Sequence, residues 1–213
     1  MSERARTPVN RGRVDWTGDN PGIYLKTDEA GDWSALALSF KITLSPHGRG
    51  RAMLVLGAPD EAVGYPAAPN LCIAENDSLM RYLIEGYISK FPTFRGRAGL
   101  AAMPILPLDE AIQEGSYQSV QTETVKSGGT RLAMTWRGLG APFAVEVSPE
   151  QSATGEHDMY SLFMEAGSAG IAVDNQPLPG QVVKRPFFGT QLSSGFLAFS
   201  ETWVTPTPAE GGA

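Results

Sequence analysis

The chain contains very little cysteine and histidine. Cys72 is its only cysteine, which excludes an intrachain disulfide and a metal site built from cysteines. His47 and His157 are its only imidazoles, and they lie far apart in the sequence. Metal sites of the jelly-roll type gather several histidines with a carboxylate, so we expect no metal ion here.

Long apolar runs and four common nucleotide-binding or catalytic motifs are also missing. No stretch approaches the roughly 18 apolar residues that a membrane-spanning helix needs. The N-terminal stretch MSERARTPVNRGRVDW lacks the apolar segment of a signal peptide, and we expect a cytoplasmic protein without a membrane partner. The patterns GxGxxG, GxSxG and HExxH and the P-loop are absent, so we expect no cofactor.

The charge of the chain makes nucleic acid an unexpected partner. The formal net charge is −6, whereas binding to phosphates requires a surplus of cations. The N-terminus differs, because it carries four arginines and a single acidic residue, namely Arg4, Arg6, Arg11, Arg13 and Glu3. We interpret residues 1–14 as a flexible basic arm, with contact to an anion or to another subunit as the alternative.

Glycine and proline are abundant, with 24 and 16 residues, which is typical of many turns between short elements. The clearest strand runs from Trp33 to Leu44, where large apolar residues alternate with smaller or polar ones in a period of two. Similar patterns predict further strands at 51–57, 70–74, 117–126, 130–137, 143–147, 159–165, 170–173 and 196–204.

Two helices are expected between these strands. Asn76 or Asp77 can cap a helix that ends near Phe91, before Pro92. A shorter helix is predicted over residues 107–114, ended by glycine.

Two segments are predicted to lack regular structure. Residues 174–195 form a long connection rich in proline and glycine, of the kind that serves as a lid or a binding loop. Residues 205–213 are expected to be a disordered tail.

The order of elements predicts a mainly β fold. About eight short strands with one or two helices favour a curved antiparallel sheet or β-barrel in a single domain over residues 15–204. A β-sandwich is the alternative. The chain shows no βαβ repetition, which disfavours a doubly wound sheet.

Glu201 is the leading candidate for proton transfer. Regular alternation places it on one face of its strand with Leu197, Phe199 and Trp203. A carboxylate among apolar side chains is desolvated, which raises its pKa and suits it to acid–base chemistry near neutrality. The alternatives are a residue paired with an arginine at the end of the strand, or an outward face covered by the N-terminal segment.

Two further groups could take part in acid–base chemistry. Glu165 ends a strand with similar alternation, so Glu165 and Glu201 could form a carboxylate pair if both strands line one cavity. His157 lies between Glu156 and Asp158, and it could shuttle protons if it faced a pocket. A solvated loop is the alternative for His157.

Aromatic and basic residues supply candidate ligand contacts. Six aromatic side chains could line a hydrophobic cavity instead of filling the core: Tyr82, Trp136, Phe187, Phe188, Phe199 and Trp203. The tripeptide Arg-Gly-Arg occurs at 11–13, 49–51 and 95–97. Guanidinium groups bind carboxylates and phosphates through two hydrogen bonds, so Arg49, Arg51 and Arg97 are candidate anion ligands. Solvated arginines in turns are the alternative.

The sequence leaves three functions open. The first is a small-molecule-binding β-barrel that acts as a cofactor-independent lyase, isomerase or cyclase on an apolar substrate, with Glu201 moving the proton and an arginine steadying an enolate or carboxylate. The second is a non-catalytic carrier or sensor of an apolar ligand. The third is an interaction protein, a homo-oligomer whose sheet is completed by another subunit through the N-terminal arm.

Overall fold

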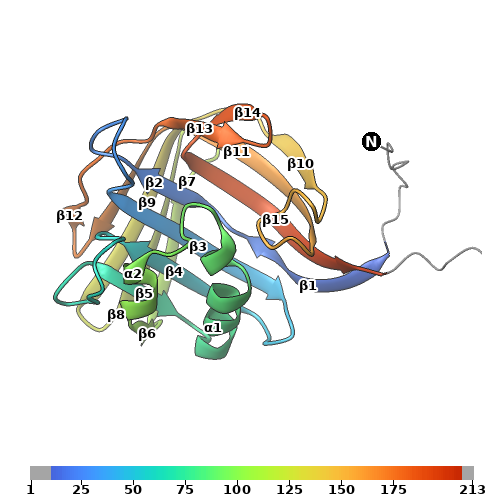
Figure 1. Ribbon diagram of the computed structural model, residues 1–213. Coiled ribbons are helices and arrows are strands. Elements are labelled where there is room, and N and C mark those ends of the chain that lie inside the picture. The colour runs from blue at the N-terminus through green and yellow to red at the C-terminus, as the bar shows by residue number, and fades with distance from the viewer. Residues whose placement is uncertain (1–10, 208–213) are drawn as a thin grey trace, which may run out of the picture.

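The computed structural model describes residues 11–207, and strands dominate it (Figure 1). They form one large, curved, mixed sheet and a small two-stranded sheet. The mainly β class predicted from the sequence is therefore confirmed.

The first half of the chain builds one side of the large sheet. Its strands are β1 (Gly12–Asp19), β2 (Gly22–Leu25), β3 (Ala35–Leu44), β4 (Gly50–Leu56), β5 (Asn70–Ala74) and β6 (Ile105–Pro107). The strands β3, β4 and β5 pair antiparallel, as short connections allow. The strand β6 pairs with β5 in parallel after a helical connection, which makes the sheet mixed.

The second half of the chain builds the other side. Its main strands are β7 (Glu110–Gly115), β8 (Val120–Ser127), β9 (Thr130–Leu139), β11 (Asp158–Val173) and β15 (Gly195–Pro206). The short strands β10 (Phe143–Val147) and β12 (Gln176–Pro177) both pair with β11. The strands β1 and β15, from opposite ends of the chain, lie side by side and join the two halves.

The large sheet curves until its two halves face each other (Figure 1). Buried apolar side chains fill the space between them, including Ile23, Leu25 and Val55 from one half and Leu132, Met134 and Trp136 from the other. The hydrogen-bonded order of the described strands ends at β6 on one side and β7 on the other. The architecture is thus a curved sheet that stays open between these two strands.

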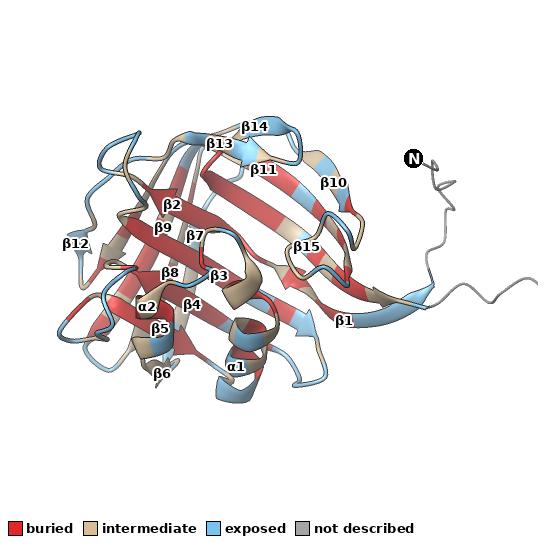
Figure 2. Ribbon diagram, viewed as in Figure 1, coloured by how far each residue is buried: buried red, intermediate tan, exposed pale blue. Residues whose placement is uncertain are grey.

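Helices cover the outer face of the first half. They are α1 (Asp77–Gly86), the short 3₁₀ helix η1 (Ile88–Lys90) and α2 (Ala98–Ala102). The side chain of Asn76 caps α1 by accepting the N–H of Leu79 over 3.0 Å. Leu79 and Leu83 join a second buried cluster on this face, so β3 and β4 have covered side chains on both sides (Figure 2).

The predicted helix over residues 107–114 is wrong. Residues 110–115 form β7, which pairs with β8 along its whole length. Ala111 and Leu108 pack against the cluster inside the curved sheet. Strand pairing and burial therefore outweigh the local helix signals of this segment.

The long connection over residues 174–195 contains more structure than its composition predicts. It holds β12 and a hairpin of β13 (Lys184–Phe187) and β14 (Thr190–Ser193). Phe188 and Gly189 turn this hairpin with φ values of 42° and 82°, as a two-residue type I′ turn requires.

The two ends of the chain are partly ordered in strands. Gly12 at the start of β1 pairs with Pro206 at the end of β15. Residues 12–14 of the expected arm and residues 205–206 of the expected tail therefore belong to strands. The rest of both expectations concerns residues 1–10 and 208–213, which lie outside the described residues.

Candidate functional site

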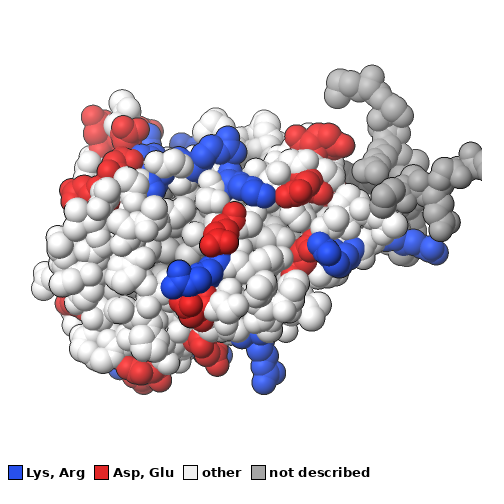
Figure 3. All heavy atoms as spheres, turned by 60° about the horizontal axis from the view of Figure 1, so that its bottom comes forward, with Lys and Arg blue, Asp and Glu red and all other residues white. Residues whose placement is uncertain are grey.

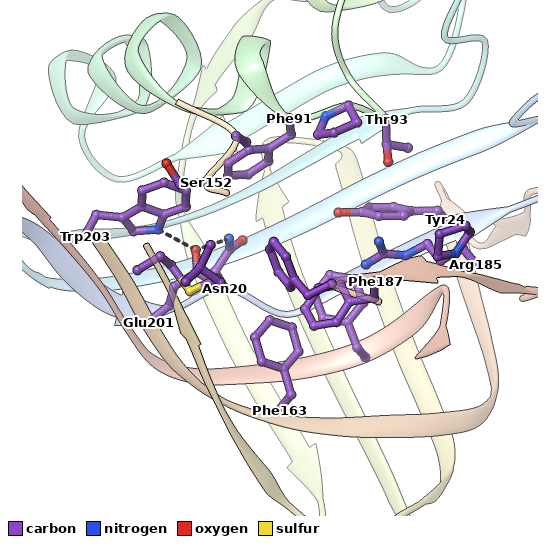
Figure 4. A pocket seen from close by; sticks show the side chains of 17 residues that line it. Asn20, Tyr24, Phe91, Thr93, Ser152, Phe163, Arg185, Phe187, Glu201 and Trp203 are labelled. Carbon is purple, nitrogen blue, oxygen red and sulfur yellow. Dashed lines mark hydrogen bonds between the residues drawn. The ribbon is translucent and has the colours of Figure 1, made fainter. Parts of the chain in front are cut away.

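A cavity of about 260 Å³ opens on the outer face of β11 and β15 (Figure 4). Side chains of these strands form one wall, among them Phe163, Phe196 and Glu201. The segment that follows η1 and the β13–β14 hairpin supply much of the remainder, including Phe91 and Phe187. Most of the lining is aromatic or aliphatic.

The cavity lies on a different side of the sheet from the one expected. A ligand site inside a barrel would need a hollow between the two halves of the sheet, where Trp136 and its neighbours are fully buried. The Trp136 indole donates its N–H to the carbonyl of Gly22 over 3.1 Å and does not line the cavity. On the outer face, residues of the β13–β14 hairpin and of the segment after η1 line the cavity.

Glu201 is buried in the cavity wall, with 4% of its surface exposed. Its Oε1 accepts hydrogen bonds from Trp203 Nε1 over 2.7 Å and from Asn20 Nδ2 over 3.1 Å. No donor of the described residues reaches the second oxygen. Burial raises the pKa of Glu201 to about 7, although the bonds from Trp203 and Asn20 act in the opposite direction.

A β-bulge directs Glu201 to this face. Tyr160 of β11 pairs with Thr202 and Leu162 pairs with Phe199, so β15 has one extra residue between the two pairs. The bulge inverts the alternation that the sequence implies. Glu201 therefore shares the cavity face with Phe196 and not with Phe199.

Ser200 carries the backbone strain of the bulge. Its φ is 50°, in the left-handed region that residues other than glycine seldom adopt. Its N–H donates to Asp19 Oδ1 over 3.1 Å, which ties the bulge to the end of β1. Strained backbone of this kind is often found at active sites and ligand-binding sites.

Arg185 lies at the opposite end of the cavity from Glu201 (Figure 4). Its guanidinium carbon is 5.2 Å from the ring centroids of Tyr24 and Phe187 and 5.4 Å from that of Phe196. Burial lowers the pKa of Arg185, but an arginine starts high enough to stay charged. Burial raises the pKa of Tyr24 to about 12, which keeps the phenol neutral at physiological pH.

Glu165 and Glu201 do not form the predicted carboxylate pair. Glu165 lies opposite Phe196, five residues along β15 from Glu201, which amounts to about 16 Å in extended chain. Glu165 instead binds Lys184 Nζ over 2.7 Å and the backbone N–H of Ser193. Burial raises the pKa of Glu165, but these contacts outweigh it and leave the pKa below its ordinary value.

His157 lies behind the cavity wall and does not line it, so the condition for a proton shuttle is not met. Its Nδ1 is 2.8 Å from Thr154 Oγ1, and its Nε2 is 3.4 Å from a carboxylate oxygen of Asp15. Its ring packs edge-on against Trp203. Burial lowers the pKa of His157, although the charge of Asp15 opposes the shift. The neutral imidazole helps to hold Trp203 in place.

The candidate aromatic residues divide between the cavity and the rest of the molecule. Trp203, Phe187 and Phe188 line the cavity. Tyr82 of α1 stacks on His47, with ring centroids 4.6 Å apart. Phe199 faces the other side of the sheet, where it meets Tyr117. Tyr82, Trp136 and Phe199 therefore do not line this cavity.

None of the three candidate anion-binding arginines lines the cavity. Arg97 binds both carboxylate oxygens of Asp60, over 2.7 and 2.8 Å. Arg49 and Arg51 are exposed near the start of β4. On the face in Figure 3, basic and acidic side chains lie next to each other and do not form a single basic field. The arginine in the cavity, Arg185, was not predicted.

The described residues offer no ready metal site. Within residues 11–207, no group of three or more His, Cys, Asp or Glu is placed to hold a metal ion. Cys72 is buried, which raises its pKa and leaves it a protonated thiol. No helix in the same range has both the length and the apolar character needed to span a bilayer.

Comparisons of the chain with protein-family models, with curated proteins and with solved structures found no match. The function is therefore inferred from the chemistry of the cavity.

Proposed function

We propose that the protein binds a small, mainly apolar molecule in this cavity and moves a proton on it through Glu201, as a cofactor-independent lyase, isomerase or cyclase does. The observation that carries the proposal is the buried carboxyl group of Glu201, held by one oxygen in an aromatic wall. Pockets that combine apolar walls with a few polar groups and a perturbed pKa are the usual sites of ligand chemistry.

The size of the cavity supports a small ligand. Its 260 Å³ is the room that about nine water molecules take in the liquid, which is slightly below the usual range for drug-sized ligands. Phe91, Phe163 and Phe187 present rings to this space. An apolar body of one or two rings would release poorly bound water and fill it.

The state of Glu201 supports proton transfer. A group with a pKa of about 7 is present in both protonation states at neutral pH, which is the optimum for general acid–base catalysis. Trp203 and Asn20 fix the carboxyl group through Oε1, and the second oxygen is left for a substrate.

Asn20 can serve both protonation states of Glu201. In the present orientation Nδ2 donates to the carboxylate, while the buried Oδ1 has no donor among the described residues. A half turn of the amide would present Oδ1 as an acceptor for the proton of a neutral Glu201. The amide of Asn20 can therefore hydrogen-bond to Glu201 in either protonation state.

A non-catalytic carrier of an apolar ligand is the second candidate. It is favoured by the β13–β14 hairpin over the cavity and by Phe188, whose half-exposed ring lies at the rim. In that case Glu201 would be only a polar anchor for the ligand.

Hydrogen exchange on a bound molecule separates the two candidates. Small molecules released from the purified protein on denaturation would be identified by mass spectrometry, then returned to fresh protein in D₂O. We expect the wild type and Glu165→Gln to catalyse deuterium uptake or turnover, and Glu201→Gln to bind the molecule but lose at least about 100-fold in rate.

Two other results would argue against proton transfer by Glu201. A rate in Glu201→Gln equal to that of the wild type would overturn the role of this carboxyl group. Tight binding by the wild type without any exchange or turnover would favour the carrier.

A further inference from the structure

Arg185 is a half-buried cation without an anionic partner among the described residues. It forms no salt bridge or side-chain hydrogen bond with any residue in the range 11–207, and its Nε is fully enclosed. Several other arginines do pair with a carboxylate: for example, Arg13 pairs with Asp15, and Arg97 pairs with Asp60. A buried N–H without an acceptor is costly, so such groups in native proteins usually have a partner or await one.

The rings around Arg185 hold the cation without neutralising it. Tyr24, Phe187 and Phe196 each present a face to the guanidinium group at 5.2 to 5.4 Å. Cation–π contacts favour the charged form and fix the plane of the group. They accept none of its N–H donors in the plane. Nε is enclosed, so the N–H donors that remain for a ligand are those of the two terminal nitrogens.

We infer that the molecule bound in this cavity carries a carboxylate, and that Arg185 binds this carboxylate at the end of the cavity opposite Glu201. The inference deepens the proposed function and rests on it for the choice of this cavity as the ligand site. A planar carboxylate matches the fork of a guanidinium group through two parallel hydrogen bonds.

Two features favour a carboxylate over a phosphate. The cavity is small and has mainly apolar walls, and a doubly charged phosphate would lose far more hydration on entering it. Arg185 is also the only cation that lines the cavity in the described part of the chain. One positive charge balances one monocarboxylate.

Tyr24 adds a hydrogen-bond donor at the Arg185 end of the cavity. Its hydroxyl group points into the cavity near Arg185 and has no hydrogen-bond partner among residues 11–207 (Figure 4). As a neutral phenol it can donate to the same carboxylate. The apolar body of the ligand would then lie along Phe163 and Phe187, with its far end at Glu201. Glu201 would thus act on a carbon remote from the carboxylate.

Calorimetric titration of the full chain with 3-phenylpropanoate and with 3-phenylpropanamide tests this assignment. The two probes have nearly the same shape and differ in charge. At pH 6 we expect the wild type to bind the acid at least about 10-fold more tightly than the amide, as a charged hydrogen-bonded pair implies. In Arg185→Gln this preference should vanish while the affinity for the amide is retained.

Two control variants test whether the preference for the acid comes from Arg185. Arg49→Gln removes an exposed arginine outside the cavity and should keep the full preference for the acid. Arg185→Lys keeps the charge without the fork, and it should keep a reduced preference even if Arg185→Gln folds poorly.

Three results would overturn the inference: no binding of the acid to the wild type at millimolar concentration, equal affinity for both probes, or a preference that survives in Arg185→Gln. Its failure is distinguishable from failure of the proposed function. Glu201→Gln should still prefer the acid, whatever it does to proton transfer, because it leaves Arg185 in place.

Discussion

Trp203 donates its indole N–H to Oε1 of Glu201 over 2.7 Å, although the two residues are only two positions apart on the same strand. Side chains two apart on a strand share a face, so the indole leans along the strand to reach the carboxylate. Asn20 approaches the same oxygen from the end of β1. The carboxyl group is thereby fixed in direction while its other oxygen stays available to the cavity.

Trp203→Phe should raise the pKa of Glu201 further. The variant keeps a ring in place but removes one of two hydrogen bonds that favour the anion. A hydrogen bond to a charged group contributes about 1.5–3 kcal/mol, which corresponds to about one or two pH units. The shift would be read from the carboxyl carbon of Glu201 by NMR titration.

Trp136→Phe is the matched control for that experiment. Its indole N–H binds the carbonyl of Gly22 in the other apolar cluster and does not touch Glu201. The pKa of Glu201 should not change in this variant. An unchanged pKa in Trp203→Phe as well would mean that the hydrogen bond does not stabilise the anion.

Glu201→Gln should make the protein more stable at pH 8. The folded state keeps the Glu201 proton up to a pKa of about 7, whereas an unfolded glutamate loses it near its ordinary pKa. Wild-type stability therefore falls as pH rises between these two values, by about 3 kcal/mol from this group alone. Glutamine has the same shape and no charge to bury.

Urea unfolding at pH 8 and at pH 4 measures this difference. The variant should gain up to about 3 kcal/mol over the wild type at pH 8 and little at pH 4, where Glu201 is protonated in both states. If Glu201→Gln and the wild type had the same free energy of unfolding at both pH values, the carboxylate would be well solvated.

The bulge at Ser200 should respond to substitution according to its backbone. Ser200→Gly relieves the positive φ and should be neutral or stabilising by up to about 1 kcal/mol, whereas Ser200→Val should cost about 1–3 kcal/mol. The control is Ser168→Val at an exposed position of β11 with ordinary φ, which should change the free energy of unfolding little. Equal effects of valine at both positions would argue against strain at Ser200.

Binding of 3-phenylpropanoate should weaken as pH rises through 7. Glu201 ionises in this range and places a second negative charge in the cavity, while Arg185 stays charged and Tyr24 stays neutral. Repulsion between charges at the two ends of a partly dry cavity amounts to a several-fold loss of affinity. Calorimetry from pH 5.5 to 8.5 would follow this loss, and Glu201→Gln should bind equally across the range. A loss that persists in Glu201→Gln would trace to another group.

The strands were largely predictable because each carries its own alternation. The segment of β3 and the β8–β9 hairpin could be located from periodicity and turn residues alone. The helix predicted over 107–114 was wrong because β7 is held by pairing with β8, which no local pattern reveals.

The site was predictable only in part. The burial of Glu201 follows from its apolar strand, but its face does not, since one extra residue at Ser200 inverts the alternation. Arg185 could not be found, because its ring contacts with Tyr24 of β2 and Phe196 of β15 arise from strand packing that no local pattern reveals. The one local signal was that Arg185 lies two residues before the pair Phe187 and Phe188 in the long connection.

The proposed proton transfer depends most directly on the ionisation of Glu201 in the folded protein. Titration of its carboxyl carbon by NMR, assigned by comparison with Glu201→Gln, measures this pKa without any knowledge of the ligand. We expect a value of about 7. A value near that of a solvated glutamate would mean that water reaches the carboxylate, and the proposed proton transfer would lose its basis.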